Sequence, residues 1–365
     1  MSTPVHKEPL LRIAKRDKIP WWKAWGIRVL SVVLALVISG LFICAVTRLN
    51  PAQVYEAMFN GAFGTSRRSW VTIRDAMMLL CIGIGLAPAF KMRFWNIGAE
   101  GQILVRGCAT AGFMIYFGGT LPTPVLLILM AVVSLAAGAV WGIIPALFKS
   151  RWGTNETLFT LMMNYIAIGI VNWLQGGPWE GRPGSQIIPQ FGDSAVLPKV
   201  LGVHCGWIIV LVLTVLMYFY MKYTKQGYEI AVVGESQNTA RYAGMSVSGI
   251  VMRTMFLSGA LSGIVGFVVC SGADNTLHSG VAAGVGFTAI TVAWLAQLNP
   301  FAMVAISMLL AVLEKGAATL QTQMQVPASI SDIITGIILF CMLGCEFFIN
   351  YEVILRGHHK EVTGA

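Results

Sequence analysis

Long apolar runs alternate with short polar segments along the whole of this chain of 365 residues. A helix needs roughly 20 predominantly apolar residues to cross the hydrocarbon core of a bilayer. By this measure the pattern predicts about ten transmembrane helices, several of them short or interrupted by glycine. The predicted spans are Arg28–Thr47, Ala76–Phe90, Ile97–Phe117, Pro124–Phe148, Thr157–Leu174, Trp207–Tyr220, Val251–Ser271, Val285–Leu298, Phe301–Leu320 and Ser329–Phe348.

The composition agrees with this pattern. Hydrophobic residues make up 56% of the chain and charged residues 11%, whereas soluble domains carry about 25% charged residues. We therefore expect an all-α polytopic membrane protein. It should have a basic N-terminal tail (1–28), a transmembrane domain (29–348) with a polar loop at 224–250, and a C-terminal tail (349–365).

Lysine and arginine are distributed unevenly between the two sides of the predicted spans. If the N-terminus lies inside, the inner segments hold 17 of these residues and the outer segments hold 7. The inner loops of membrane proteins carry the excess of positive charge. We therefore expect both termini and the 224–250 loop to be cytoplasmic. The basic tail is interpreted as this orientation signal and not as a nucleic-acid site.

The polar stretch Thr224–Arg253 is the longest soluble interruption in the C-terminal half. Ser236 is a candidate helix N-cap, Gly234 can leave a helical conformation, and Gly244 is placed to end a helix. The sequence thus predicts a short helix between two spans. Two interpretations stay open: a solvated connector, or a docking helix for a cytoplasmic partner.

The outer segments and the small residues predict further local structure. The segment Gln175–Gly206 is rich in proline, glycine and tryptophan, so we expect an ordered outer loop that could receive a partner. An amphipathic piece is expected within Asn50–Arg74, with Val54, Ala57 and Met58 on one face. Glycine pairs at helix-packing spacing predict close contacts between spans. These pairs are Gly138/Gly142, Gly259/Gly263 and Gly280/Gly284.

Signatures of catalysis and of nucleotide binding are missing. There is no phosphate-binding loop, no zinc-protease motif and no nucleophile elbow. The seven cysteines contain no C-x-x-C pair and are interpreted as core residues. We therefore expect neither an enzyme nor a resident metal or cofactor.

A few polar residues lie in or beside the predicted spans. Asn96, Glu100 and Gln102 surround a glycine-broken helix start, NIGAEG, and a second glycine-rich start, GVAAGVGF, opens a later span at Gly280. Paired broken helices mark the pathway in many transporters, which makes these three residues, with Asn275 and Phe287, candidates for the substrate pathway. Equally, the polar groups could satisfy backbone groups freed by the break.

Other charged residues in the spans receive a plainer interpretation. Glu100 and Arg106 are six residues apart and fall on different faces of a helix, so a simple ion pair between them is not expected. Glu314 and Lys315, in the ninth predicted span, are interpreted as helix-end residues.

Four stretches together resemble ABC-transporter permeases of the branched-chain amino acid/simple sugar (ribose-type) group, in its nucleoside and simple-sugar branch. They are FWNIGAEGQ (Phe94–Gln102), SRWGTNETLFTLMMNYIA (Ser150–Ala167), GYEIAVVGESQNTARYAGMSV (Gly227–Val247) and GVGFTAITVAWLAQLNP (Gly284–Pro300). The resemblance extends from Ala76 to Phe348. One departure is Ser236-Gln237, where the family often has Asn-Pro, which puts the fit to a particular ATPase in doubt.

The resemblance implies a ten-helix type II importer core with inverted halves in a bacterial inner membrane. It implies a second homologous permease, ATP-binding subunits on the cytoplasmic side, which use the ATP, and a substrate-binding lipoprotein or periplasmic protein outside. The 224–250 loop would then hold the coupling helix. Its expected contacts are Gly234, Glu235, Ser236, Ala240, Arg241 and Gly244.

Two other classes of function compete with an ABC importer of nucleosides or simple sugars. An ion-coupled secondary transporter of a small polar solute also uses broken helices, but it should show a membrane-buried carboxylate pair or ion cage. A membrane enzyme or scaffold is disfavoured by the missing catalytic motifs.

Overall fold

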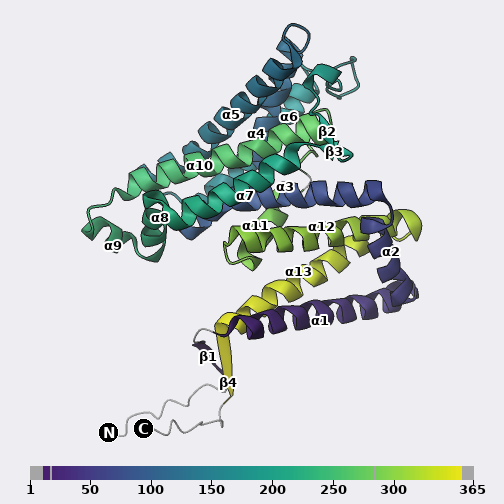
Figure 1. Ribbon diagram of the computed structural model, residues 1–365, viewed down its shortest axis with the longest axis vertical. Coiled ribbons are helices and arrows are strands. Elements are labelled where there is room, and N and C mark those ends of the chain that lie inside the picture. Colours follow the sequence, from purple (N-terminus) through teal and green to yellow (C-terminus); the bar gives the residue numbers. More distant parts are fainter. Residues whose placement is uncertain (1–10, 17–18, 283, 356–365) are drawn as a thin grey trace. The chain divides into compact units, whose positions relative to one another are not determined.

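The computed structural model describes residues 11–16, 19–282 and 284–355. This part of the chain is almost entirely helical, with two short antiparallel strand pairs (Figure 1). The helices are α1 (Trp21–Thr47), α2 (Pro51–Phe63), α3 (Ser66–Lys91), α4 (Ala99–Phe117), α5 (Thr123–Trp152), α6 (Glu156–Gln175), α7 (Gly206–Tyr223), α8 (Lys225–Glu235), α9 (Gln237–Tyr242), α10 (Val247–Val268), α11 (Val285–Leu295), α12 (Pro300–Gln323) and α13 (Ala328–Asn350). The shorter elements are η1 (Asp193–Ala195), η2 (Val269–Ala273), β1 (Leu11–Lys15), β2 (Lys199–Val200), β3 (Val203–His204) and β4 (Tyr351–Leu355).

Among the described residues, eight helices are long and apolar enough to cross a membrane. They correspond to α1, α3, α5, α6, α7, α10, α12 and α13. The other two predicted spans are helices as well, but neither is a complete apolar span. The first turns of α4 carry Glu100, Gln102 and Arg106, and α11 has 11 residues, which rise only about 16 Å. The expectation of about ten spans therefore fits ten helices, two of them unusual.

The chain divides into two compact units, residues 1–58 with 317–365, and residues 59–316. In the first unit α1 packs on α13, and β1 pairs with β4 so that Leu11 faces Leu355. The two tails therefore leave the same end of this helix pair, as an even number of spans requires. The sequence pattern did not predict this strand pair.

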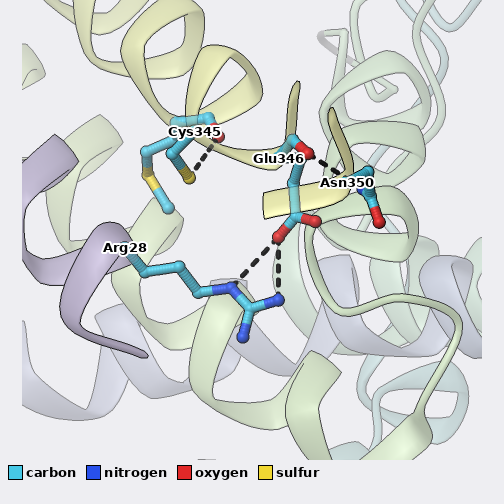
Figure 2. A network of polar contacts seen from close by, with 5 residues as sticks. Arg28, Cys345, Glu346 and Asn350 are labelled. Carbon is cyan, nitrogen blue, oxygen red and sulfur yellow. Dashed lines mark hydrogen bonds and ion pairs between the residues drawn. The ribbon is translucent and has the colours of Figure 1, made fainter. Parts of the chain in front are cut away.

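An ion pair joins the two helices of the first unit. The guanidinium of Arg28, on α1, donates from Nε and Nη2 to Oε1 of Glu346, on α13, at 3.0 and 2.8 Å (Figure 2). One turn further along, the Ser31 hydroxyl donates to the Cys341 carbonyl at 2.6 Å. A charge close to the apolar region is tolerated when it is paired in this way.

The amphipathic segment expected before α3 is present as α2. Val54, Ala57 and Met58 are all buried, and the Tyr55 hydroxyl donates to the carbonyl of Leu36 on α1. The predicted face of this segment is therefore confirmed.

The second unit is built around α3, in which every residue from Leu79 to Phe90 is buried. Its most extensive helix contact is between α5 and α10, and α4 lies against both. The glycine pairs make this contact possible. A Cβ added to Gly259 would lie 2.4 Å from the Gly138 carbonyl oxygen, and one added to Gly142 would lie 2.6 Å from the Met255 carbonyl oxygen. The close packing predicted for the Gly138/Gly142 and Gly259/Gly263 pairs is confirmed.

The loop between α6 and α7 is ordered, as the sequence predicted. Its backbone is tied to the segment that follows η2: Phe191 donates to the Asn275 carbonyl at 2.7 Å, and Leu197 donates to the Ser271 carbonyl at 2.8 Å. The Thr276 hydroxyl adds a bond to the Ile188 carbonyl at 3.0 Å. Within this unit, Figure 1 shows α8 and α9 at one end of α7 and α10, and β2 and β3 at the other.

Candidate functional site

The 224–250 loop contains two helices where the sequence predicted one. Thr224 caps α8, its hydroxyl accepting from the Gly227 N–H at 3.1 Å. Ser236 ends α8 and caps α9, its hydroxyl accepting from the Thr239 N–H at 3.2 Å. Gly244 follows α9 with φ 76°, a left-handed conformation that suits glycine. The predicted cap at Ser236 and stop at Gly244 are confirmed.

Gly234 has a different role from the one predicted. It lies inside α8 and is buried, so it does not release the chain from a helix. A Cβ added there would lie 1.9 Å from the carbonyl oxygen of Lys91, the last residue of α3. Gly234 therefore permits direct contact between the backbones of α8 and α3. Sequence reasoning missed this because the contact is made with a distant part of the chain.

Ala240 is also placed differently from the expectation. It is fully buried in an apolar cluster of its own chain, with Met92, Phe94, Ile230 and Ile250 among its members. Its small side chain thus allows α9 to pack on this cluster and does not face a partner.

The opposite side of α9 is open. Gln237, Asn238, Arg241 and Tyr242 are exposed, and 93% of Tyr242 is accessible. Glu235, at the end of α8, is exposed as well. The loop therefore presents a polar and aromatic surface on α9, whose opposite side is packed on the apolar cluster through Ala240.

An ion-pair group joins α8 to α10. The carboxylate of Glu229 pairs with Arg253 on α10 and lies 3.9 Å from Lys225 on α8. Together with the Gly234 contact, these pairs fix α8 to both α3 and α10, two of the long helices.

A second candidate site lies at the two glycine-broken helix starts. The chain from Phe94 to Gly98 is not helical, and side chains of α6 satisfy its backbone. Asn164 accepts from the Gly101 N–H at 2.9 Å and donates to the Ile97 carbonyl at 3.0 Å. Asn96 is fully buried, and its side-chain Oδ1 accepts from the Gly98 N–H at 3.0 Å.

Glu100 joins this first broken start to the second. Its Oε1 accepts from the Gly284 N–H at 2.7 Å, and its Oε2 accepts from the Gly286 N–H at 2.9 Å. These N–H groups begin α11, where an anion is favoured by the helix dipole and by the unpaired donors. Gly286 is needed for this approach, since a Cβ there would lie 2.6 Å from the Glu100 nitrogen. Of the two interpretations left open for Glu100, the geometry supports the one in which it satisfies backbone groups.

An aromatic stack links the same two motifs at their other ends. The rings of Trp95 and Trp294 are stacked with centroids 5.2 Å apart, and Phe90 packs 5.6 Å from Trp294. The FWNIGAEGQ and GVGFTAITVAWLAQLNP stretches are therefore one structural unit, held by a carboxylate at one end and by stacked indoles at the other.

Arg106 is buried completely and lies between α4, α5 and α10. Its Nη2 donates to Gln102 at 3.1 Å and to the Gly259 carbonyl at 2.7 Å, and no carboxylate pairs with it in the described part of the chain. The expectation that Glu100 and Arg106 form no ion pair is consistent with this geometry. A Cβ on Gly138 would lie 2.3 Å from Arg106 Nε, so this glycine also makes room for the guanidinium.

The other predicted pathway residues are not all gathered in one place. Phe287 follows Gly286 on α11, and its ring is exposed. Asn275 instead belongs to the segment that holds the loop between α6 and α7, with φ 52° and its backbone carbonyl accepting from the Phe191 N–H. Substrate contact by any of these five residues stays a prediction.

The sequence analysis missed a charged cluster inside the second unit. Asp75, on α3, accepts from Arg74 at 2.8 Å with one oxygen and pairs with Lys315, on α12, at 2.5 Å with the other. Neighbouring Glu314 accepts from the hydroxyl of Thr288 on α11. The sequence does carry a signal for this cluster. Two apolar helices each contain a pair of adjacent residues of opposite charge, Arg74-Asp75 in α3 and Glu314-Lys315 in α12.

Replacing Glu100 by Gln should weaken the junction between α4 and α11. Glutamine has an acceptor oxygen at only one of the two positions and turns its NH₂ donor toward the other N–H. A hydrogen bond to a charged group contributes about 1.5–3 kcal/mol, so we expect a lower melting temperature in detergent and a several-fold loss of folded protein. Melting measured by fluorescence-detected size exclusion tests this. Wild-type melting of the Glu100→Gln protein would show that the clamp contributes nothing to stability.

Comparison with known proteins identifies the family. The family model described as "Branched-chain amino acid transport system / permease component" matches residues 71–343, which includes both broken helix starts and the 224–250 loop. The chain belongs to this family. The resemblance found in the sequence motifs is thereby confirmed, and the permease is a multi-pass membrane component of an ABC transporter.

Three curated relatives extend over almost the whole permease. The glucose ABC transporter permease protein TsgB13 of Haloferax volcanii is 31% identical, covering 94% of this chain and 93% of the relative. The guanosine ABC transporter permease protein NupP of Bacillus subtilis is 32% identical, with 85% and 90% covered. The nucleoside ABC transporter permease protein NupB of Lactococcus lactis is 26% identical, with 90% and 93% covered. These relatives are permease subunits and not enzymes, as expected for this chain.

Proposed function

We propose that the permease imports a nucleoside or a simple sugar across a bacterial inner membrane. The named substrates of the three relatives, guanosine, nucleosides and glucose, support this range because all are neutral solutes that carry several hydroxyl groups. Two permease chains would pair, and a binding protein would deliver the solute at the outer loop, residues 175–206. Lysine and arginine are in excess in the segments on the same side of the predicted spans as the two termini, which supports cytoplasmic termini.

The energy for import would come from ATP-binding subunits that dock on the 224–250 loop. The observation that carries this proposal is the open face of α9, where Arg241 and the almost fully exposed Tyr242 stand on a helix anchored by buried Ala240. Tyrosine and arginine are the side chains that most often dominate protein interfaces. A solvated connector would not need an aromatic ring of this size in water.

The structure suggests how a movement of this surface would reach the spans. α9 packs through Ala240 on the cluster that contains Met92 and Ile250, and α8 contacts the end of α3 through Gly234. α10 is tied to α8 by the Arg253–Glu229 pair. A push on α9 would therefore be transmitted to α3 and α10 as a rigid movement. These two helices border α4 and α11, where the broken starts meet.

The test is Tyr242→Ala in the reconstituted complex with its ATP-binding subunits and binding protein. We expect ATPase activity stimulated by loaded binding protein to fall at least about tenfold, the usual cost of removing an aromatic contact at the centre of an interface. Membrane abundance and melting should be unchanged, because the ring touches little of its own chain.

Tyr228→Ala is the matched control, since Tyr228 is exposed on α8 of the same loop. It should keep most of the stimulated activity. Full stimulation in Tyr242→Ala, or equal losses in both variants, would rule out α9 as the specific contact.

A further inference from the structure

The charged cluster of α3 and α12 lies within two helices that are long and apolar enough to cross a membrane. Asp75 is nine residues beyond Ser66, about 13 Å along α3, and Lys315 is eight residues before Gln323, about 12 Å along α12. Ionised groups in the apolar part of a membrane are costly unless they are paired and face the protein interior or water. The side chains of Asp75 and Lys315 are 21% and 36% exposed, so both charged groups remain partly accessible.

The contacts of this cluster extend to the broken helix start of α11. Glu314 is bonded to Thr288, and Thr288 lies one turn after Gly284, the residue whose N–H is held by Glu100. Polar contacts therefore connect four helices in turn: α3 to α12, α12 to α11, and α11 to α4. An ion pair that served only to join α3 to α12 would need neither Glu314 nor Thr288.

A further pair of charged residues lies close by. Oδ2 of Asp274, just beyond η2, lies 3.9 Å from Nε2 of His278. Burial raises the pKa of Asp274, and the charges of Arg74, Asp75, Lys315 and His278 also act on it. These residues are therefore within electrostatic reach of one another.

Two unpaired donors belong to residues that line a cavity together with Arg74. His204 and Trp207 line a small cavity together with Arg74, and His204 Nε2 and Trp207 Nε1 are buried with no hydrogen-bond partner among the described residues. Burial lowers the pKa of His204 to about 4, so its ring is neutral. Its Nδ1 accepts from the Gly206 N–H, which leaves the proton on Nε2. Two N–H groups of residues that line this cavity are thus left without a partner among the described residues.

We propose that Asp75, Glu314, Lys315 and Thr288 form a binding station for the hydroxyl groups of a neutral polyhydroxylated solute on its way through the permease. The proposal rests on the proposed import function and names the residues that would recognise the solute. Carboxylates accept hydrogen bonds from hydroxyls, and an ammonium group donates to hydroxyl oxygens. The formal charges of Arg74, Asp75, Glu314 and Lys315 cancel, which suits a neutral ring, while the two carboxylates oppose a phosphorylated one.

The experiment measures transport in proteoliposomes that contain the complete complex and saturating loaded binding protein. The solutes are radiolabelled guanosine and 2′-deoxyguanosine, with glucose and 2-deoxyglucose as the second pair. For Glu314→Gln we expect about tenfold less solute moved per ATP hydrolysed, while stimulated ATPase activity stays at the wild-type level. We also expect the preference for the full hydroxyl set over the deoxy analogue to decrease. Thr288→Val should act in the same direction and more weakly.

Glu156→Gln is the matched control, because it removes the same charge from the Lys149–Glu156 pair, which lies outside the cluster. It should leave the solute moved per ATP unchanged. The station is ruled out if Glu314→Gln keeps the wild-type transport ratio and selectivity. It is equally ruled out if all activities of that variant fall in proportion to its abundance, as expected for a purely structural ion pair. A wild-type complex that moves none of the four solutes would instead contradict the proposed function.

Discussion

Gly234→Ala is expected to separate the 224–250 loop from the transmembrane helices. The added methyl carbon would lie 1.9 Å from the Lys91 carbonyl oxygen and 3.0 Å from its carbon. Both are backbone atoms at the end of α3, so no side-chain rotation can relieve the overlap. Overpacking that forces side-chain and backbone shifts costs roughly 1–3 kcal/mol and occasionally more. We therefore expect near-complete loss of stimulated ATPase activity and transport in the assembled complex, with a marked fall in abundance.

Gly169→Ala provides the control for this substitution. Gly169 lies within α6, and a Cβ added there meets nothing within 4 Å. Because alanine favours a helix by about 1 kcal/mol over glycine, this variant should be as stable as the wild type or more so. Cross-linking between cysteines placed on α8 and the end of α3 would report the separation directly. Wild-type transport by Gly234→Ala would show that this backbone contact is not needed for coupling.

The 224–250 loop shows which features can be predicted from a sequence. Ser236 and Gly244 were predicted correctly because capping and left-handed turns depend on residues within a few positions along the chain. The roles of Gly234 and Ala240 depend on which distant residues pack against them, Lys91 in one case and the Met92 cluster in the other. No local pattern carries that information. In the sequence, a small residue that contacts a partner protein cannot be distinguished from one that is buried in the core of its own chain.

The broken helix starts were found from glycine content, but their relation was not. The pattern placed Glu100 beside one break and left its role open between substrate and backbone. Only the fold brings the N–H groups of Gly284 and Gly286 to its carboxylate. The charged cluster was missed for a different reason. Arg74 and Asp75 precede the predicted span Ala76–Phe90, but α3 begins at Ser66 and includes them. Glu314 and Lys315 were placed within a predicted span but were interpreted as helix-end residues, so no link to α3 was expected.

Gly138→Ala is expected to disrupt the centre of the second unit. The added carbon would lie 2.3 Å from Arg106 Nε and 2.6 Å from the Gly259 carbonyl oxygen. Arg106 cannot withdraw without breaking its bonds to Gln102 and Gly259, and doing so would leave a buried charge without partners. Removing the partners of a buried charge costs about 3–5 kcal/mol, so a correctly folded population should be hard to detect in detergent.

Gly336→Ala is the matched substitution for this prediction, because Gly336 is exposed on α13 and has no atom within 4 Å of the added carbon. The two variants are compared by size exclusion and by melting in the same detergent. Gly336→Ala should elute and melt like the wild type, while Gly138→Ala should elute as aggregate or melt far below it. A double variant, Gly138→Ala with Arg106→Met, removes the guanidinium but keeps the overlap with the Gly259 carbonyl, so it should recover only part of the loss. Full recovery would assign the whole cost to the buried charge, and no loss in Gly138→Ala alone would show that α5 and α10 do not pack through these glycines.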